Sequence, residues 1–163
     1  MKISKGLVLH YFINREELLL GLVEYILEQH LRLMTSDLTG EIDSREKLVN
    51  FIEDLFSRKW NRYFDDGVFY SCYALIYRMP SFKESFRSYL EELHQVLFKK
   101  LEEASRNEVI ANRNLSEITE VIFALIDGAY YYLGMFQESE KMYANQVSVY
   151  TKHSLNLLVF KQK

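Results

Sequence analysis

The sequence predicts an all-α fold, and three observations support this prediction. Four segments open with Ser, Asn or Asp followed three residues later by Glu, the capping-box pattern of helix N-termini. Each of these segments continues with apolar residues at helical spacing. The chain has one proline and six glycines, too few to mark the turns of many short strands. We therefore expect a bundle of long helices.

The first long helix is expected from Arg15 to about Met34, with Asn14 and Glu17 as its capping box. Its apolar stripe consists of Leu18, Leu22, Ile26 and Leu33. Residues 35–42 are expected to form a loop. The first helix therefore ends before a short connection to the next one.

Asp43 and Glu46 open the second expected helix, which runs to Tyr63 and is broken by the Asp65-Asp66-Gly67 segment. A shorter apolar helix is expected over residues 68–78. We expect Pro80 to end it, because the residue before a proline is pushed out of the α region.

Ser81 and Glu84 open a long amphipathic helix. Its apolar face consists of Phe86, Leu90, Leu93, Leu97 and Leu101. After a polar loop, residues 106–113, Asn114 and Glu117 begin the next helix, which reaches about Gln137. A last helix is expected over residues 143–160.

Length and composition narrow the class of protein. A chain of 163 residues, 48% apolar and 15% aromatic, fits one domain with a substantial core and not a disordered protein. The lone Cys72 excludes an intramolecular disulfide and suits a reducing cytoplasm. We expect no secretion signal, because no basic region followed by an apolar run opens the chain. The most apolar window, residues 118–136, contains Glu120 and Asp127, so we expect a buried helix and not a membrane span.

The pattern of the opening residues predicts a short helix, a break and then the start of the long helix. Ser4 is of a residue type preferred at helix N-caps, and apolar residues recur from Leu7 to Phe12 at helical spacing. Residues 1–15 carry a charge of +3, so the remainder of the chain carries −6. Any affinity for nucleic acid is therefore expected at the N-terminus.

The pattern Ser-Lys-Gly-x-x-x-His-Tyr-Phe-x-x-Arg-Glu-Glu-Leu-Leu at residues 4–19 resembles the end of the DNA-binding domain in the tetracycline-repressor (TetR) family of transcriptional regulators. The run Leu7-Val8-Leu9 is similar to the branch around the choline-responsive BetI regulators. The resemblance implies a TetR-like helical bundle. Residues 1–14 would be a remnant of the helix-turn-helix, and residues 15–163 the ligand-sensing and dimerisation domain, with 15–34 as the linking helix.

In the family this recognition helix follows two further helices, which the sequence does not show before Met1. A recognition helix reads the major groove only when a supporting helix holds it there. We therefore expect a truncated regulator that retains ligand binding and dimerisation but little DNA binding. The matching positions that would contact DNA are Ser4, Lys5, Leu7, His10, Tyr11 and Arg15. The alternative is that these residues form only a surface-lying segment.

An aromatic cluster is the candidate ligand site, because family members hold a small molecule between helices of this part of the chain. The candidate ligand-binding residues are Trp60, Phe64, Tyr70, Tyr73, Tyr77, Phe86, Tyr89, Phe123, Asp127 and Tyr131. The expected ligand is small and hydrophobic or aromatic, with a cationic ligand left open by Asp127, which interrupts an apolar helix. The alternatives are that the rings form only core and that Asp127 bonds to a tyrosine or to a partner subunit.

The last two helices carry apolar residues on more than one face, so a second subunit is expected to cover them and form a homodimer. The candidate interface residues are Ala129, Leu133, Val147, Tyr150, Ser154, Leu157 and Leu158. The alternative is intramolecular packing alone.

We expect no enzyme, cofactor or metal site. The four histidines are scattered, Cys72 has no base near it in the sequence, and no phosphate- or dinucleotide-binding glycine motif is present. Glu91-x-x-His94 has the spacing of a metal-ligand pair, but di-metal bundles need two such copies and the sequence has one. The sequence therefore favours a ligand-responsive, repressor-type regulator. The alternative is a helical ligand-binding or scaffold protein with no DNA role.

Overall fold

The structure is a computed structural model that describes residues 12–59, 66–136 and 139–161. These ranges contain six α-helices and no named strand, which confirms the all-α prediction. The helices are α2 (Arg15–Asp37), α3 (Arg45–Phe56), α4 (Asp66–Tyr73), α5 (Pro80–Arg106), α6 (Leu115–Gly134) and α7 (Glu140–Asn156).

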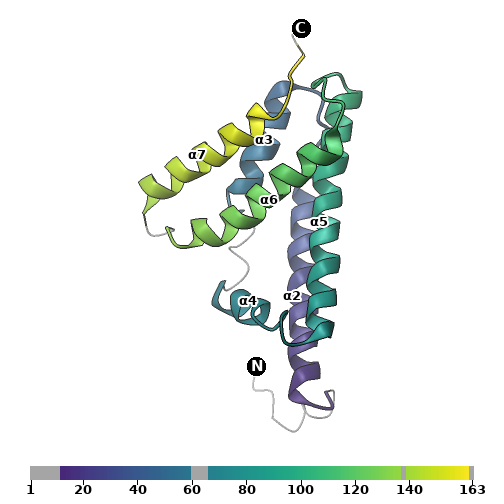
Figure 1. The fold of residues 1–163 in the computed structure, drawn as a ribbon, viewed down its shortest axis with the longest axis vertical. Coiled ribbons are helices and arrows are strands. Elements are labelled where there is room, and N and C mark those ends of the chain that lie inside the picture. The colour runs from purple at the N-terminus through teal and green to yellow at the C-terminus, as the bar shows by residue number, and fades with distance from the viewer. Residues whose placement is uncertain (1–11, 60–65, 137–138, 162–163) are drawn as a thin grey trace.

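The two longest helices, α2 and α5, lie side by side in parallel along the long axis of the molecule (Figure 1). The short α4 lies near their N-terminal ends and contacts α2. At the other end, α6 crosses α5, and α7 returns beside α6 while both contact α3. Helices α6 and α7 therefore form one outer layer of this end of the molecule.

Two of the four predicted capping boxes have their expected cap. The Asn14 side chain accepts a hydrogen bond from the backbone N–H of Glu17 (2.9 Å), and Asn114 accepts one from the N–H of Glu117 (3.3 Å). These caps satisfy backbone donors that the first turn of a helix leaves without a partner. The starts of α2 and α6 are therefore fixed by local sequence.

The N-caps of the other two helices differ from the prediction, by one residue for α3 and by two for α5. Ser44, and not Asp43, caps α3 by accepting from the N–H of Lys47 at 3.3 Å. Helix α5 begins at Pro80, and no side chain caps it, so Ser81 lies inside its first turn. Proline suits this position because it lacks the N–H that would be left without a partner. The preceding helix, α4, ends earlier than predicted, at Tyr73, and is followed by turns.

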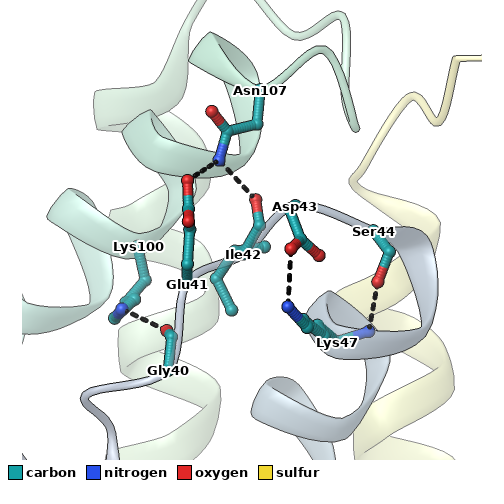
Figure 2. Close-up of polar contacts among 8 residues, drawn as sticks. All are labelled: Gly40, Glu41, Ile42, Asp43, Ser44, Lys47, Lys100 and Asn107. Atoms are coloured by element: carbon teal, nitrogen blue, oxygen red, sulfur yellow. Dashed lines mark hydrogen bonds and ion pairs between the residues drawn. The ribbon is translucent and has the colours of Figure 1, made fainter.

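The loop between α2 and α3 is tied to the C-terminal end of α5 (Figure 2). The Lys100 ammonium donates to the Gly40 carbonyl at 2.6 Å. The Asn107 amide donates to the Glu41 carboxylate and to the Ile42 carbonyl, both at 3.1 Å. These bonds hold the C-terminal end of α2 against α5.

Two hydrophobic clusters lie along the molecule. The larger joins α3, α6 and the C-terminal halves of α2 and α5, and its largest fully buried side chains are Leu48, Ile52, Phe56, Leu101, Ile110, Ile122 and Leu133. The smaller joins α4 with the N-terminal halves of α2 and α5, and consists of Val23, Leu27, Cys72, Phe82, Phe86 and Tyr89. The space where the two clusters meet is not filled by side chains.

Candidate ligand cavity and candidate interfaces

A cavity of about 510 Å³ lies between α2, α4, α5 and α6, where the two clusters meet. Its size falls in the range of small-molecule sites in proteins. Each of the four helices contributes one face. The lining residues are Ile26, His30, Met34, Phe69, Tyr70, Tyr73, Ala74, Phe86, Tyr89, Leu90, Leu93, Phe123, Ile126, Asp127, Gly128, Tyr130 and Tyr131.

Aromatic rings from three helices form much of the cavity wall. The Phe86 ring on α5 meets Phe69 (5.8 Å between ring centroids) and Tyr73 (5.4 Å) on α4, both edge to face. The Tyr70 ring on α4 meets Tyr131 on α6 edge to face at 5.5 Å. Such pairs hold the rings at fixed angles and stabilise the fold by about 1 kcal/mol each beyond their buried area. The wall is therefore both apolar and ordered.

A buried polar pair, His30 on α2 and Tyr89 on α5, lies in the same wall. The His30 Nδ1 and the Tyr89 hydroxyl are hydrogen-bonded, and their residues are only 7% exposed each. Burial lowers the pKa of His30 to about 4, because desolvation disfavours the charged imidazolium. Burial, and then the charge of nearby acidic groups, raises the pKa of Tyr89. Both groups are therefore neutral at pH 7, and their bond joins the two long helices at the cavity.

Asp127 on α6 is the one carboxyl-bearing side chain among the described residues that line the cavity. Burial raises the pKa of its carboxyl from the ordinary value of an aspartate. The residue is nonetheless exposed on one side, which places it at the mouth of the cavity and not in its depth. Its negative charge also raises the pKa of Tyr73, after the larger effect of burial, so the carboxylate lies within electrostatic reach of the opposite wall.

The structure brings together seven of the ten predicted ligand-binding residues: Tyr70, Tyr73, Phe86, Tyr89, Phe123, Asp127 and Tyr131. Tyr77 lies outside the cavity and is 85% exposed, because α4 ends before it and the following turns direct it to the surface. Trp60 and Phe64 lie outside the described residues.

Sequence reasoning did not include the α2 wall, which consists of Ile26, His30 and Met34. These residues follow one another at intervals of four and so lie on one face of the helix. A histidine in the middle of an apolar row is the signal that identifies this face, because a buried histidine needs a polar partner.

Of the candidate DNA contacts, Ser4, Lys5, Leu7, His10 and Tyr11 lie outside the described residues. Arg15 is the first residue of α2 and is exposed. Phe12 packs against this helix, with its ring 3.2 Å from the position that a Cβ atom on Gly21 would occupy. Phe12 is therefore held against the N-terminal half of that helix.

The candidate interface residues lie largely on the inner faces of α6 and α7. Ala129, Leu133, Ser154 and Leu158 are buried within the single chain, where they face α3 and α5. Val147, Tyr150 and Leu157 are half-buried beside them. The small size of Gly134 makes room for a side chain of the same chain, since a Cβ atom at this position would lie 3.1 Å from the Arg58 guanidinium. Intramolecular packing therefore buries four of the seven candidate interface residues and covers part of the other three.

A second apolar stripe begins on α6 and ends just past it. It consists of Val121, Leu125, Gly128, Tyr132 and Met135, which lie on one face at intervals of three and four residues. Its residue Leu125 packs against the larger cluster and Gly128 also lines the cavity, whereas its other members are exposed. Val121, Tyr132 and Met135 are 44%, 43% and 61% exposed. Met142 and Val149 on α7 are also exposed, at 49% and 42%. We call these seven residues the outer face.

The described residues contain no group of three His, Cys, Asp or Glu side chains that lies close enough to hold a metal ion. Glu91 pairs with Arg87 (3.8 Å) and His94 with Glu120 (3.0 Å), so the Glu91-x-x-His94 pair does not converge on one point. Among the helices that the structure describes, none has the length and apolar character needed to cross a membrane.

Comparison with known proteins identifies the family. Residues 43–160, most of the chain, match the family described as the tetracyclin repressor-like C-terminal domain. No curated protein and no solved structure matches at the significance threshold of these searches. The matched segment includes α3, α4, α5, α6 and α7, and so three of the four walls of the cavity. The chain therefore belongs to the tetracycline-repressor-like (TetR) family.

Proposed function

We propose that this protein is a ligand-responsive, repressor-type regulator of transcription that acts as a homodimer in the cytoplasm. The observation that carries the proposal is the ring-lined cavity, one wall of which is α2. The same helix continues, at its N-terminal end, from the residues that resemble a recognition helix. A molecule in the cavity would therefore touch the helix that leads to the DNA-reading end.

The contacts of α2 support a rotation of this helix about its C-terminal end when a ligand binds. Its C-terminal end is fixed through the Gly40 and Ile42 carbonyls, which accept hydrogen bonds from α5. Its middle is joined to α5 through His30 and Tyr89 beside the cavity. A ligand that competes for this bond, or widens the cavity, changes the angle of α2 about the fixed end. Ligand binding then shifts the population between two arrangements of differing DNA affinity.

Ligand binding is tested by thermal unfolding in the presence of a library of small apolar and aromatic compounds. A compound at about 100 times its Kd stabilises the folded chain by about 2.7 kcal/mol, which raises the Tm by several degrees. The variant Ala74→Trp adds a large ring at an exposed lining position, and we expect it to abolish the shift. The matched variant Ala144→Trp, on the exposed surface of α7, is expected to keep it. The cavity would not be the ligand site if no compound shifted the Tm, or if Ala74→Trp responded like the wild type.

DNA binding separates the regulator from a helical ligand-binding or scaffold protein. An operator duplex bound by the intact regulator is expected to dissociate as salt is raised, because phosphate contacts release counterions. A ligand found in the thermal screen is expected to lower that affinity. A ligand-binding protein with no DNA role predicts neither effect.

A further inference from the structure

The polar and charged side chains of the cavity wall indicate the class of ligand more specifically than its apolar residues do. At neutral pH, Asp127 is the single charged side chain among the described lining residues, because His30 is uncharged and the remaining polar lining groups are tyrosine hydroxyls. No described lysine or arginine lines the cavity. An anionic ligand would therefore meet a like charge in the lining. The Arg58 guanidinium lies over the Tyr130 ring, 5.5 Å from its centroid, but does not itself line the cavity.

The Asp127 carboxylate has no ion pair or hydrogen bond with the described part of the chain that would neutralise it. Its neighbours on α6 are rings: Phe123 one turn before it and Tyr131 one turn after it, both lining the cavity. Tyr70 faces Tyr131 from α4 at 5.5 Å. The faces of aromatic rings attract cations, and a cation near a carboxylate favours its ionised form, which offsets the cost of its partial burial.

From this arrangement we propose that the cavity takes a lipophilic cation, an organic ammonium or phosphonium ion, with Asp127 as its counter-ion and Tyr70, Tyr131 and Phe123 around the charge. The apolar part of the ligand then lies deeper, against Phe69, Phe86 and Leu93. The inference rests on the proposed function, since it assumes that the cavity is the ligand site.

The experiment compares two ions of almost equal size and opposite charge, tetraphenylphosphonium and tetraphenylborate, by titration calorimetry with the full chain. The cation is expected to bind at least about tenfold more tightly than the anion. Asp127→Asn is expected to weaken binding of the cation about tenfold and to leave that of the anion unchanged or stronger. Glu102→Gln, which removes the same charge from an exposed position of α5 away from the cavity, is expected to change neither.

A second pair of variants tests the rings without altering the charge. Tyr131→Leu is expected to weaken cation binding by a few fold, because it removes a ring face, whereas Tyr131→Phe keeps the ring and the affinity. Tyr131 is 57% exposed, so neither change removes a core side chain.

The outcomes distinguish the inference from the proposed function. Equal affinity for the two ions, or unchanged cation affinity in Asp127→Asn, overturns the inference while the cavity remains a ligand site. Binding of neither ion, together with a thermal screen without hits, overturns both. Preferential cation binding that depends on Asp127 and on the ring of Tyr131 supports the inference.

Discussion

Ala124→Arg is expected to convert the proposed homodimer to a monomer, because we expect the outer face to be its subunit interface. Ala124 is exposed on α6 and borders the outer face, one turn from Val121 and from Gly128. In a twofold-symmetric dimer the same patch meets itself, so each substitution places one arginine at the interface from each subunit. Burying unpaired charge costs several kcal/mol, and the dimer Kd is therefore expected to rise by roughly 100-fold or more.

Analytical ultracentrifugation measures this change. The wild type is expected at twice the 19.5 kDa mass of the chain, and Ala124→Arg at the mass of one chain at the same concentration. Ala111→Arg adds the same charge at an exposed position between α5 and α6, and it is expected to remain a dimer. A monomeric wild type, or an Ala124→Arg protein that stays dimeric, would show that the outer face is not the subunit interface.

A second large effect is expected at low pH, where His30 is expected to lower the free energy of unfolding. In the folded chain burial holds the pKa of His30 at about 4, whereas the unfolded value is 6.5. Because the folded state favours the neutral imidazole, the contribution of His30 to the free energy of unfolding is largest above pH 6.5. As the pH falls from 6.5 to about 4, the unfolded chain takes up a proton that the folded chain does not, and unfolding is favoured. The difference between the folded and unfolded pKa values of His30 corresponds to a loss of about 3 kcal/mol in the free energy of unfolding.

The measurement is the free energy of unfolding in urea at several pH values. His30→Asn is the test variant, because its short amide can still bond to the Tyr89 hydroxyl but does not titrate between pH 8 and 4. The difference between wild type and His30→Asn is expected to change by about 3 kcal/mol over this range. His153→Asn, at an exposed position of α7, serves as the control and is expected to follow the wild type. Parallel curves for wild type and His30→Asn would contradict a neutral, buried His30.

Local signals explain which parts of the fold the sequence predicts. The Asn14 and Asn114 caps depend on residues three positions apart, and both form as expected. The start of α3 depends on a second local contact as well. Asp43 and Ser44 are both able to cap, but the Asp43 carboxylate pairs with the Lys47 ammonium at 2.6 Å, which leaves Ser44 as the cap. Figure 2 shows both bonds beside the contacts from α5.

The sequence predicts the starts of helices better than it predicts which face of a helix packs against the rest of the same chain. Helix α6 has two apolar stripes, one through Ile122 and Ala129 and the other through Val121 and Tyr132. The first is buried in the single chain and the second is exposed, because α3 and α5 lie on the first side. The sequence shows that two stripes exist but not which one faces α3 and α5. For the same reason the cavity rings were predicted from their clustering, whereas the contribution of α2 was not.

The central claim is that a molecule in the cavity moves the N-terminal ends of α2 in a dimer. Distance measurement by double electron–electron resonance tests it most directly, with spin labels at Glu16→Cys in a Cys72→Ser background. Glu16 is exposed in the first turn of α2, and Cys72 is buried. A saturating compound from the thermal screen is expected to shift the distribution of distances between the two labels, and Ala74→Trp to prevent the shift. Identical distributions with and without that compound would contradict the claim.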